Sequence, residues 1–426
     1  MPSRSLTEWL SYVESLHPKA IAMGLDRVAR VRDAMGIRFE CPVIIVGGTN
    51  GKGSTCAMLE AILRAAGYRV GLYTSPHLVR YNERVRINCV DASDEQLAAA
   101  FERVEEARAG EAQGTELTYF EFGTLAAAQL FSDAKLDVVV LEVGLGGRLD
   151  AVNIFDPDVA VIASIGIDHT DYLGPTREHI GLEKAGIFRS GKPAIVGDTD
   201  PPRSLLDHAA AIGAELRLIG RDFSYQMQEG QWRYLGEHAA RSGLAYPALR
   251  GARQLDNASC VLAALDALRE RLPVSMQAVR EGLALVELPG RFQVLPGLPL
   301  VILDVAHNEQ AAAVLAQNLA RLGLDARTFA VFGMLGDKDV EAVCRALKGA
   351  FAVWFVAALS GPRAAPVERV LAAIRAADPQ AEVQAFSDPR SAFAAAKERA
   401  GQDDRIVAFG SFLNVADIMV SGLAGS

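Results

Sequence analysis

The most chemically informative stretch of the chain is residues 47–55, which read GGTNGKGST. It follows an apolar run at 42–46 and precedes a helix-like segment, so a glycine-rich turn connects a strand to a helix. Glycines let backbone N–H groups converge on phosphate oxygens, and a helix N-terminus adds partial positive charge. Lys52 would add a cation, and the hydroxyls of Ser54 and Thr55 could reach a phosphate-bound Mg²⁺. An ordinary glycine-rich turn is the alternative, but lysine followed by hydroxyls favours a nucleotide site.

A carboxylate stands at the end of another strand-like run. Glu142 lies near the end of the apolar run 137–143 and precedes the glycine-rich segment 144–148. In open parallel sheets the ligand-binding groups gather beyond the carboxyl ends of the strands, and Mg²⁺ prefers oxygen ligands. We therefore expect Glu142 to bind a magnesium ion directly or through water, with an ion pair to Arg148 as the alternative.

Two further strand ends carry polar side chains. The run 159–165 is followed by Asp168 and His169, and the strand-like run 68–73 is followed by Ser75. If these strands are neighbours, the three side chains fall at the same sheet edge as the phosphate loop. Sequence chemistry alone leaves His169 equally a metal ligand or a structural histidine, since Mg²⁺ prefers oxygen. Ser75 could approach the metal or simply cap the following turn.

Candidate contacts for an organic ligand are dispersed along the chain. The segment 118–122 reads TYFEF, and its rings could hold a flat ligand ring or pack in a core. Past a later strand, Asp304 could bond to a ribose and His307 could stack on or bond to a base. Asn257 and Arg291 would be further polar contacts, with an ordinary surface arginine as the alternative for Arg291.

Strand-like and helix-like runs alternate along the first part of the chain. A helix is expected at 93–109, where Ser93 and Gln96 have the spacing of a capping box. A hairpin-like segment follows at 223–246, and an alanine-rich helix begins at 256–257 and runs to residue 268.

A second alternating series predicts a second parallel sheet, with strands at 300–304, 328–332, 353–356, 382–386 and 405–409. The Pro- and Gly-containing segment around 288–297 is the expected hinge. We therefore predict an α/β protein with two domains. Residues 1–288 would form an N-terminal P-loop-type ATPase domain with a parallel central sheet, and residues 289–426 a smaller C-terminal Rossmann-like α/β domain.

Composition excludes several classes of protein. Half of the 426 residues are hydrophobic and 22% are charged, which predicts large folded cores. The net charge of −9 argues against a general nucleic-acid binder. Five scattered cysteines with no C-x-x-C pair predict free thiols and no zinc site. Without a signal-like start or a membrane-length apolar run, we expect a cytoplasmic protein.

Nine segments, taken in order, closely resemble the Mur ligase superfamily and, within it, the folate branch of dihydrofolate synthases/folylpolyglutamate synthases. They are GGTNGKGST (47–55), YTSPHLVRYNERVRI (73–87), TYFEFGT (118–124), LEVGLGGRLDAVN (141–153), IGIDHTDYLG (165–174), EKAGIFRSGKPAI (183–195), LPGRFQ (288–293), LDVAHN (303–308) and FGSFLNVA (409–416). They run through almost the whole chain, so the ordered set is specific where no single motif would be.

The resemblance implies an ATP-dependent amide ligase. A substrate carboxylate would attack the γ-phosphate of ATP to give an acyl phosphate, and the amine of L-glutamate would then displace the phosphate. The implied substrates are ATP, L-glutamate, dihydropteroate and reduced folates, and the implied metal is Mg²⁺ at two sites. A monofunctional folylpolyglutamate synthase, a cell-wall Mur ligase and another P-loop phosphoryl-transfer enzyme are the alternatives. We expect a monomer that binds neither nucleic acid nor membrane.

The resemblance also assigns roles to individual residues. The catalytic residues would be Lys52, Lys184 and His169. The metal ligands would be Ser75, Glu142, His169 and Lys184, the last carbamylated so that it can support a second Mg²⁺. The ATP contacts would be Asn50, Gly51, Lys52, Gly53, Ser54, Asn257, Arg291, Asp304 and His307. The pterin pocket would comprise Gly24, Leu25, Asp26, Thr118, Tyr119, Phe120, Glu121, Leu149, Asp150 and Ala151, with the segment 23–27 closing over it.

Overall fold

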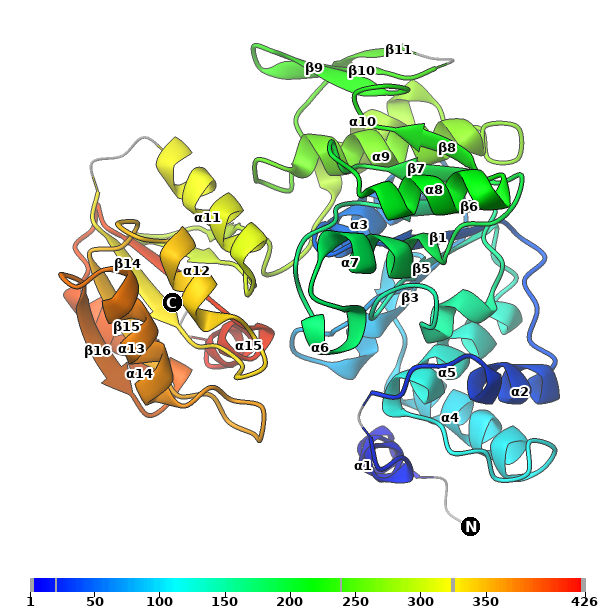
Figure 1. The fold of residues 1–426 in the computed structure, drawn as a ribbon, viewed down its shortest axis with the longest axis horizontal. Helices are drawn as coiled ribbons and strands as arrows, with labels where there is room; N and C mark the ends of the chain where they lie inside the picture. The colour runs from blue at the N-terminus through cyan, green and yellow to red at the C-terminus, as the bar shows by residue number, and fades with distance from the viewer. Residues whose placement is uncertain (1–3, 20, 238–239, 323–325, 423–426) are drawn as a thin grey trace. The chain divides into compact units, whose positions relative to one another are not determined.

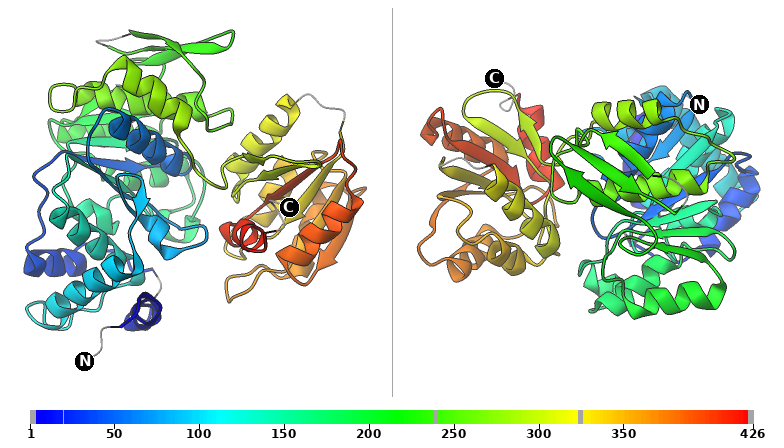
Figure 2. Two further views of the ribbon diagram at one scale, coloured as in Figure 1. Left: turned by 180° about the vertical axis from the view of Figure 1, so that it is seen from behind. Right: turned by 90° about the horizontal axis from the view of Figure 1, so that it is seen from above.

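The chain forms two compact units, each built around its own main sheet (Figures 1 and 2). The computed structural model describes residues 4–19, 21–237, 240–322 and 326–422. The first unit comprises Met1–Ile165, Thr176–Ala248 and Leu255–Val286, and the second comprises Gly166–Pro175, Leu249–Gln254 and Glu287–Ser426.

The first unit is organised by an eight-stranded sheet in the order β4-β3-β2-β5-β1-β6-β7-β8. Its strands are β1 (Val43–Gly47), β2 (Val70–Tyr73), β3 (Val85–Ile87), β4 (Val90–Asp91), β5 (Val138–Glu142), β6 (Val159–Ile162), β7 (Pro193–Val196) and β8 (Glu215–Leu218). The strands from β2 to β8 in this order run parallel, whereas β3 and β4 form an antiparallel edge. The predicted strands β1, β2, β5 and β6 are present and entirely buried, as continuous apolar runs require.

Some helices of the first unit pack on this sheet, and others pack mainly on one another. They are α1 (Leu6–Leu16), α2 (Asp26–Met35), α3 (Lys52–Ala65), α4 (Asp94–Ala109), α5 (Tyr119–Asp133), α7 (Arg177–Ala185), α8 (Arg203–Ile212), α9 (Gln254–Ala267) and α10 (Met276–Leu285), with 3₁₀ turns η1 (Tyr81–Arg84) and η2 (Ala151–Ile154). Helix α3 packs on β1, β2 and β5, while α1, α2, α4 and α5 pack together in the blue and cyan part of Figure 1. The expected capping box of Ser93 and Gln96 begins α4.

The segment predicted to be hairpin-like forms a small antiparallel sheet in the order β11-β10-β9, in which a third strand extends the hairpin. Its strands are β9 (Ser224–Gln228), β10 (Gln231–Leu235) and β11 (Ala240–Leu244). Trp232 and Tyr234 on β10 are fully buried, and the indole of Trp232 donates to the carbonyl oxygen of Ala245 at 3.0 Å. Trp232 and Tyr234 are two residues apart on β10, so they lie on the same face of this sheet, and that face is the buried one.

The second unit contains a six-stranded sheet in the order β12-β13-β17-β14-β15-β16. Its strands are β12 (Gln293–Leu295), β13 (Leu300–Leu303), β14 (Thr328–Phe332), β15 (Val353–Ala357), β16 (Glu382–Phe386) and β17 (Arg405–Phe409). All are parallel except β12, which pairs antiparallel with β13. The segment expected to be a hinge therefore contains an edge strand, fixed by the buried ring of Phe292 just before it.

Aromatic side chains hold the core of the second unit. Phe409 lies 4.8 Å from Phe332 and 5.3 Å from Phe351, measured between ring centres, and the Trp354 ring is 5.3 Å from that of Phe332. The helices of this unit are α6 (Thr170–Leu173), α11 (Glu309–Arg321), α12 (Val340–Ala346), α13 (Val367–Ala377), α14 (Pro389–Arg399) and α15 (Phe412–Val420). Side chains of α11, α12 and α13 join the same core, while α14 packs on β14 and β15.

The five cysteines are all free thiols, as expected. Among the described residues, no helix combines the length and the apolar character needed to cross a membrane.

The packing of α10 on α3 leads to a test of the fold. A methyl group at Gly282 would lie 2.5 Å from the Cα of Ile62, so backbone would have to move. Helix propensity alone favours Ala over Gly by about 1 kcal/mol, but overpacking costs about 1–3 kcal/mol. We expect Gly282→Ala to destabilise the protein in urea unfolding. The exposed Ala284→Gly variant measures the propensity effect on the same helix; a stabilised Gly282→Ala variant would contradict the close packing.

Candidate functional site

The turn after β1 is fastened to the end of β6 through its backbone. The N–H of Thr49 donates to the carbonyl oxygen of Ser164 at 2.8 Å. The N–H of Asn50 donates to the Ser164 hydroxyl at 3.2 Å, and that hydroxyl donates to the carbonyl oxygen of Asn50 at 3.0 Å. Gly48 has φ +143°, and a Cβ there would lie 3.2 Å from the amide nitrogen of Ala163. The loop can therefore approach β6 this closely only with glycine at position 48.

A residue from a distant helix completes the turn. A Cβ at Gly51, which has φ +86°, would lie 2.6 Å from Oδ1 of Asn257 on α9. The structure thus brings together Gly51 and Asn257, which were both predicted as ATP contacts. Lys52 begins α3, and its Nζ donates to the carbonyl oxygens of Gly48 at 3.0 Å and Thr49 at 3.2 Å. The ammonium group consequently lies over the loop.

Glu142 and Ser75 meet at the same edge of the sheet. Parallel pairing of β2 with β5 aligns Tyr73 with Leu141, so the residues that follow these strands are neighbours. The N–H of Ser75 donates to Oε2 of Glu142 at 3.1 Å, and Glu142 is buried. The expected alternative, an ion pair between Glu142 and Arg148, is absent from these described residues, because the Arg148 guanidinium pairs with Glu183 at 2.7 Å.

These groups fit a magnesium ion in a limited way. A buried carboxylate beside a serine hydroxyl supplies the oxygen ligands that Mg²⁺ prefers. Among the described residues, no group of three or more His, Cys, Asp or Glu side chains could hold a metal by itself. A magnesium ion here would therefore depend on substrate phosphates and water, as Mg²⁺ at nucleotide sites commonly does.

The loop after β5 packs tightly on the end of α7. A Cβ at Gly147 would lie 2.8 Å from the carbonyl oxygen of Glu183. The side-chain amide of Asn153 donates to the carbonyl oxygens of Arg148 and Gly186, both at 3.0 Å. Lys184 belongs to this last turn of α7 and is only 4% exposed. This loop therefore sets the position of a buried lysine.

Asp150 stabilises the same loop from within. Its Oδ2 accepts the N–H of Leu145 at 2.8 Å, and its Oδ1 accepts the N–H of Val152 at 3.1 Å. Burial raises the pKa of the Asp150 carboxyl to about 7, although these hydrogen bonds act in the opposite direction. Leu149 and Ala151, the other pterin candidates here, flank it, and Ala151 is buried.

The aromatic segment divides between core and surface. Phe122 is fully buried and packs in the core, whereas Tyr119 and Phe120 remain partly exposed. Thr118 and Glu121 form the capping box of α5. The buried Glu121 carboxylate also pairs with Arg27 at 2.9 Å, which links α5 to the first turn of α2.

The N-terminal pterin candidates lie just before or at the start of α2. Gly24 has φ +141°, Leu25 is the N-cap residue and Asp26 is the first helical residue.

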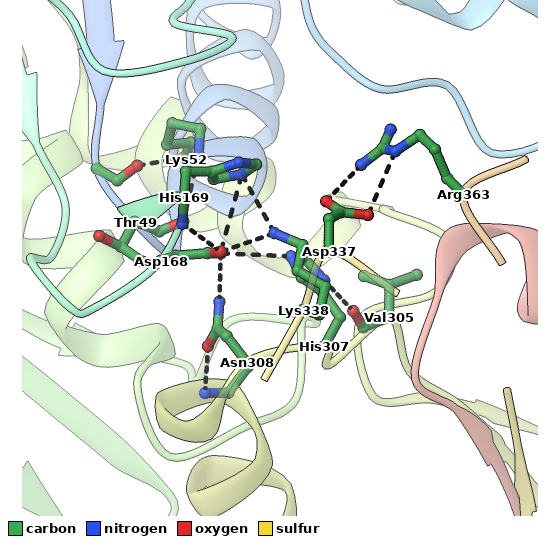
Figure 3. Close-up of polar contacts among 12 residues, drawn as sticks. Thr49, Lys52, Asp168, His169, Val305, His307, Asn308, Asp337, Lys338 and Arg363 are labelled. Atoms are coloured by element: carbon green, nitrogen blue, oxygen red, sulfur yellow. Dashed lines mark hydrogen bonds and ion pairs between the residues drawn. The ribbon is translucent and has the colours of Figure 1, made fainter. Parts of the chain in front are cut away.

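A separate polar cluster lies in the second unit, centred on Asp168 (Figure 3). Nζ of Lys338 lies 2.7 Å from Asp168 Oδ1 and 3.2 Å from Nε2 of His169. The Asn308 amide donates to Asp168 Oδ2 at 3.0 Å, and His307 Nε2 lies 3.7 Å from that same oxygen. Charge interactions with His169 and Lys338 hold the pKa of Asp168 well below its usual range despite burial. His169 thus belongs to the second unit, and Ser75 and Glu142 to the first.

No sequence pattern indicated that Lys338 would be buried. It follows a strand in the segment GDKD, where a surface lysine is the ordinary expectation, yet only 8% of it is exposed. Its partner Asp168 precedes it by 170 residues, a separation across which single-sequence patterns say nothing.

The remaining nucleotide candidates surround β13. Asp304 follows this strand and accepts the N–H groups of Phe292 at 2.9 Å and Ala306 at 2.7 Å. Burial raises the pKa of Asp304 to about 6. The guanidinium carbon of Arg291 lies 4.9 Å from the ring centre of Phe412. The half-buried side chain of Arg291 therefore packs against the first residue of α15.

Two family models match the chain: the Mur ligase middle domain over residues 46–234 and the Mur ligase, glutamate ligase domain, over residues 290–412. The dihydrofolate synthase/folylpolyglutamate synthase of Escherichia coli (strain K12) is 46% identical over 415 residues, covering 97% of this chain and 94% of that protein. The chain belongs to the dihydrofolate synthase/folylpolyglutamate synthase family. The family, fold class and ligase class predicted from the sequence are confirmed.

Solved structures agree with the membership of this family. E. coli FolC in complex with DHPP and ADP superposes with a TM-score of 0.93 at 45% identity, and 98% of each chain is covered. A bifunctional folylpolyglutamate synthase/dihydrofolate synthase with Mn, AMPPNP and L-glutamate bound has a TM-score of 0.90 at 45% identity, again covering 98% of each chain.

The raised pKa of Asp150 leads to a pH-dependent prediction. In the unfolded chain this carboxyl loses its proton near the ordinary value of 3.8, but in the folded protein only near 7. Folding therefore binds a proton between these values, and wild-type stability falls as pH rises through this interval. We expect Asp150→Asn to gain stability relative to wild type from about pH 4 to about pH 7 in urea unfolding.

The exposed Asp156→Asn serves as the control for this experiment. A stability difference between Asp150→Asn and wild type that does not change with pH would contradict the raised pKa of Asp150.

Proposed function

We propose that this chain joins L-glutamate both to dihydropteroate and to the γ-carboxylate of reduced folates, in each case with ATP. One observation carries the proposal. The turn that contains Gly51, with Asn257 packed against it, lies at the same edge of the first sheet as the Ser75–Glu142 pair. A phosphate loop beside oxygen ligands for a metal suits the activation of a carboxylate by ATP. The relatives bound to ADP, an ATP analogue, DHPP and L-glutamate support the same substrates here.

In this proposal the turn Asn50–Ser54 binds the phosphates of ATP. Its N–H groups and the N-terminus of α3 face the phosphate oxygens, and Lys52 offsets the repulsion between the triphosphate and the substrate carboxylate. Asn257 would add a polar contact beside Gly51. Arg291, Asp304 and His307 are proposed as further ATP contacts; the positions of both oxygens of Asp304 are fixed by backbone N–H groups.

Ser75, Glu142 and His169 are the proposed ligands of one Mg²⁺, and a carbamylated Lys184 would support a second. The metal would neutralise charge on the phosphates during transfer. An ordinary lysine ammonium would repel a second cation, whereas a carbamate is an anion and would attract it. The 4% exposure of Lys184 fits a group whose charge matters locally, since a buried charge is weakly screened.

The reaction places definite demands on the remaining residues. The substrate carboxylate attacks the γ-phosphate, ADP leaves, and an acyl phosphate forms; the glutamate amine then attacks the acyl carbon and phosphate leaves. His169 is proposed to act at this centre with Lys52 and Lys184. Water must be excluded from the acyl phosphate, because hydrolysis would waste it.

The pterin ring would lie beside the partly exposed Tyr119 and Phe120 and the loop 149–151. The segment 23–27 is proposed to close over dihydropteroate, since Arg27 ties it to Glu121 at the start of α5. Residues 1–288 would thus bind ATP and pterin, and residues 289–426 would act as the glutamate ligase domain. That the protein is a cytoplasmic monomer without affinity for nucleic acid or membrane stays a prediction.

Release of phosphate from ATP tests the function directly. With L-glutamate present, we expect release to depend on either dihydropteroate or tetrahydrofolate, and mass spectrometry to detect the product carrying one more glutamate. The Lys52→Ala variant should lose this activity, because the β- and γ-phosphates lose their fixed cation.

Other outcomes of this assay identify the alternatives. Activity with tetrahydrofolate but not dihydropteroate would leave a monofunctional folylpolyglutamate synthase, and activity with a UDP-muramyl precursor a cell-wall ligase. Phosphate release without any of these acceptors would point to a different phosphoryl-transfer enzyme.

The role of Lys184 can be tested separately from folding. We expect Lys184→Ala to be nearly inactive, and short carboxylic acids to restore part of the activity by supplying the missing anion. Lys192→Ala is the control. Lys192 also lies between β6 and β7, but its ammonium group pairs with Asp158 at 3.1 Å. Full activity of Lys184→Ala at limiting Mg²⁺ would rule out the carbamate.

A further inference from the structure

Arg84 is a buried arginine with no carboxylate within ion-pair distance among the described residues. It ends the 3₁₀ turn η1 and is 9% exposed. Its Nε donates to Nδ1 of His77 at 2.8 Å. Its guanidinium carbon lies 5.2 Å from the ring centre of Tyr81 and 5.6 Å from that of Tyr119. A buried charge without an ionic partner is costly, and no step proposed so far uses it.

The acidic side chains nearest in sequence are engaged elsewhere. Both carboxylate oxygens of Glu83 accept backbone N–H groups, at 2.6, 2.8 and 2.6 Å, from the residues 78–80. Asp94 accepts hydrogen bonds from the side chains of Arg80 and Asn82. The carboxylates of this loop therefore bind other groups and do not neutralise Arg84.

Hydrogen-bond donors of this pair remain available. Neither Nη group of Arg84 donates a hydrogen bond to a described residue. Both Nη atoms are in contact with solvent. Because Nδ1 of His77 accepts from Arg84, the proton of the neutral ring lies on Nε2, which is a further donor. Convergent N–H donors on a guanidinium match the two oxygens of a carboxylate.

The position of Arg84 and His77 in the chain indicates which carboxylate they could bind. His77 follows two residues after Ser75, whose N–H binds Glu142. Tyr119, which contacts Arg84, is the first residue of α5 and the neighbour of Phe120 in the proposed pterin pocket. The pair thus connects the proposed metal ligands with the proposed pterin pocket, where the glutamyl part of a folate has to lie.

We propose that Arg84 and His77 bind a carboxylate of a glutamyl group that is not itself activated. The inference rests on the proposed function. A folate carries such a group, the α-carboxylate beside its reacting γ-carboxylate, whereas the single carboxylate of dihydropteroate is the one that reacts. Free L-glutamate also brings carboxylates, so the folate tail and the incoming glutamate are two possible sources of the same chemistry.

The test compares Arg84→Met with Arg84→Lys and wild type. Methionine keeps an apolar stem over the two tyrosines and removes the charge, and lysine restores the charge without the planar fork. Arg80→Met is the matched control, because Arg80 lies beside the same turn with an exposed side chain paired to Asp94. KM and kcat are measured for tetrahydrofolate, dihydropteroate and L-glutamate, together with tetrahydrofolate binding by calorimetry and Tm.

A charge-assisted hydrogen bond of the usual strength corresponds to about a 10- to 100-fold change in affinity. If the folate tail is bound, Arg84→Met raises KM and Kd for tetrahydrofolate by this factor and leaves the KM for dihydropteroate unchanged. If free glutamate is bound, its KM rises by the same factor with either acceptor. In both cases Arg84→Lys recovers part of the loss, Arg80→Met resembles wild type, and the Tm of Arg84→Met does not fall.

Three results would overturn the proposal. Unchanged KM values for all substrates would leave Arg84 without a ligand. A lower Tm with an equal loss of kcat for both acceptors would mean that Arg84 only supports the tyrosine rings. A raised KM for dihydropteroate alone would mean that it meets the reacting carboxylate. Failure of the wild-type protein with both acceptors would refute the proposed function itself, independently of Arg84.

Discussion

Parallel pairing of β2, β5, β1 and β6 is the constraint on which the rest of the site depends. In a parallel sheet every strand ends at the same edge, so the loops that follow these four strands have to meet there. The Thr49–Ser164 and Ser75–Glu142 hydrogen bonds are direct results of that register. Shifting one strand along its neighbour would separate these partners, even if every side chain were kept.

Stability is given up at several buried polar positions, in each of the two units. Asp150 and Asp304 are buried carboxyls with raised pKa values, and Arg84 is a buried cation beside a histidine and two tyrosine rings. Well-packed apolar side chains would generally stabilise such positions more. In contrast, the sheet interiors and the aromatic core around Phe409 follow the usual rules of packing. The apolar interiors stabilise the fold enough for the buried polar side chains to be kept.

Much of this arrangement could be predicted from the sequence, because its signals are local. The four buried strands are continuous apolar runs, and Ser93 and Gln96 have the spacing of the cap that begins α4. Glycines mark the turn between β1 and α3. Strand β12 was missed because three residues between Pro- and Gly-containing turns resemble a linker, and only pairing with β13 makes them a strand. The burial of Arg84 and Lys338 was not predicted, because their partners come from other positions in the chain.

The second unit is discontinuous in sequence, since it takes residues 166–175 and 249–254 from within the stretch that otherwise builds the first. During synthesis on the ribosome, Asp168 therefore emerges 170 residues before Lys338, its closest cation. The N-terminal sheet can assemble while that aspartate is still solvated, and the acid is buried only after most of the chain has been translated. For the same reason, expressing residues 289–426 alone would produce a fragment in which Lys338 and Asn308 lack their shared acid.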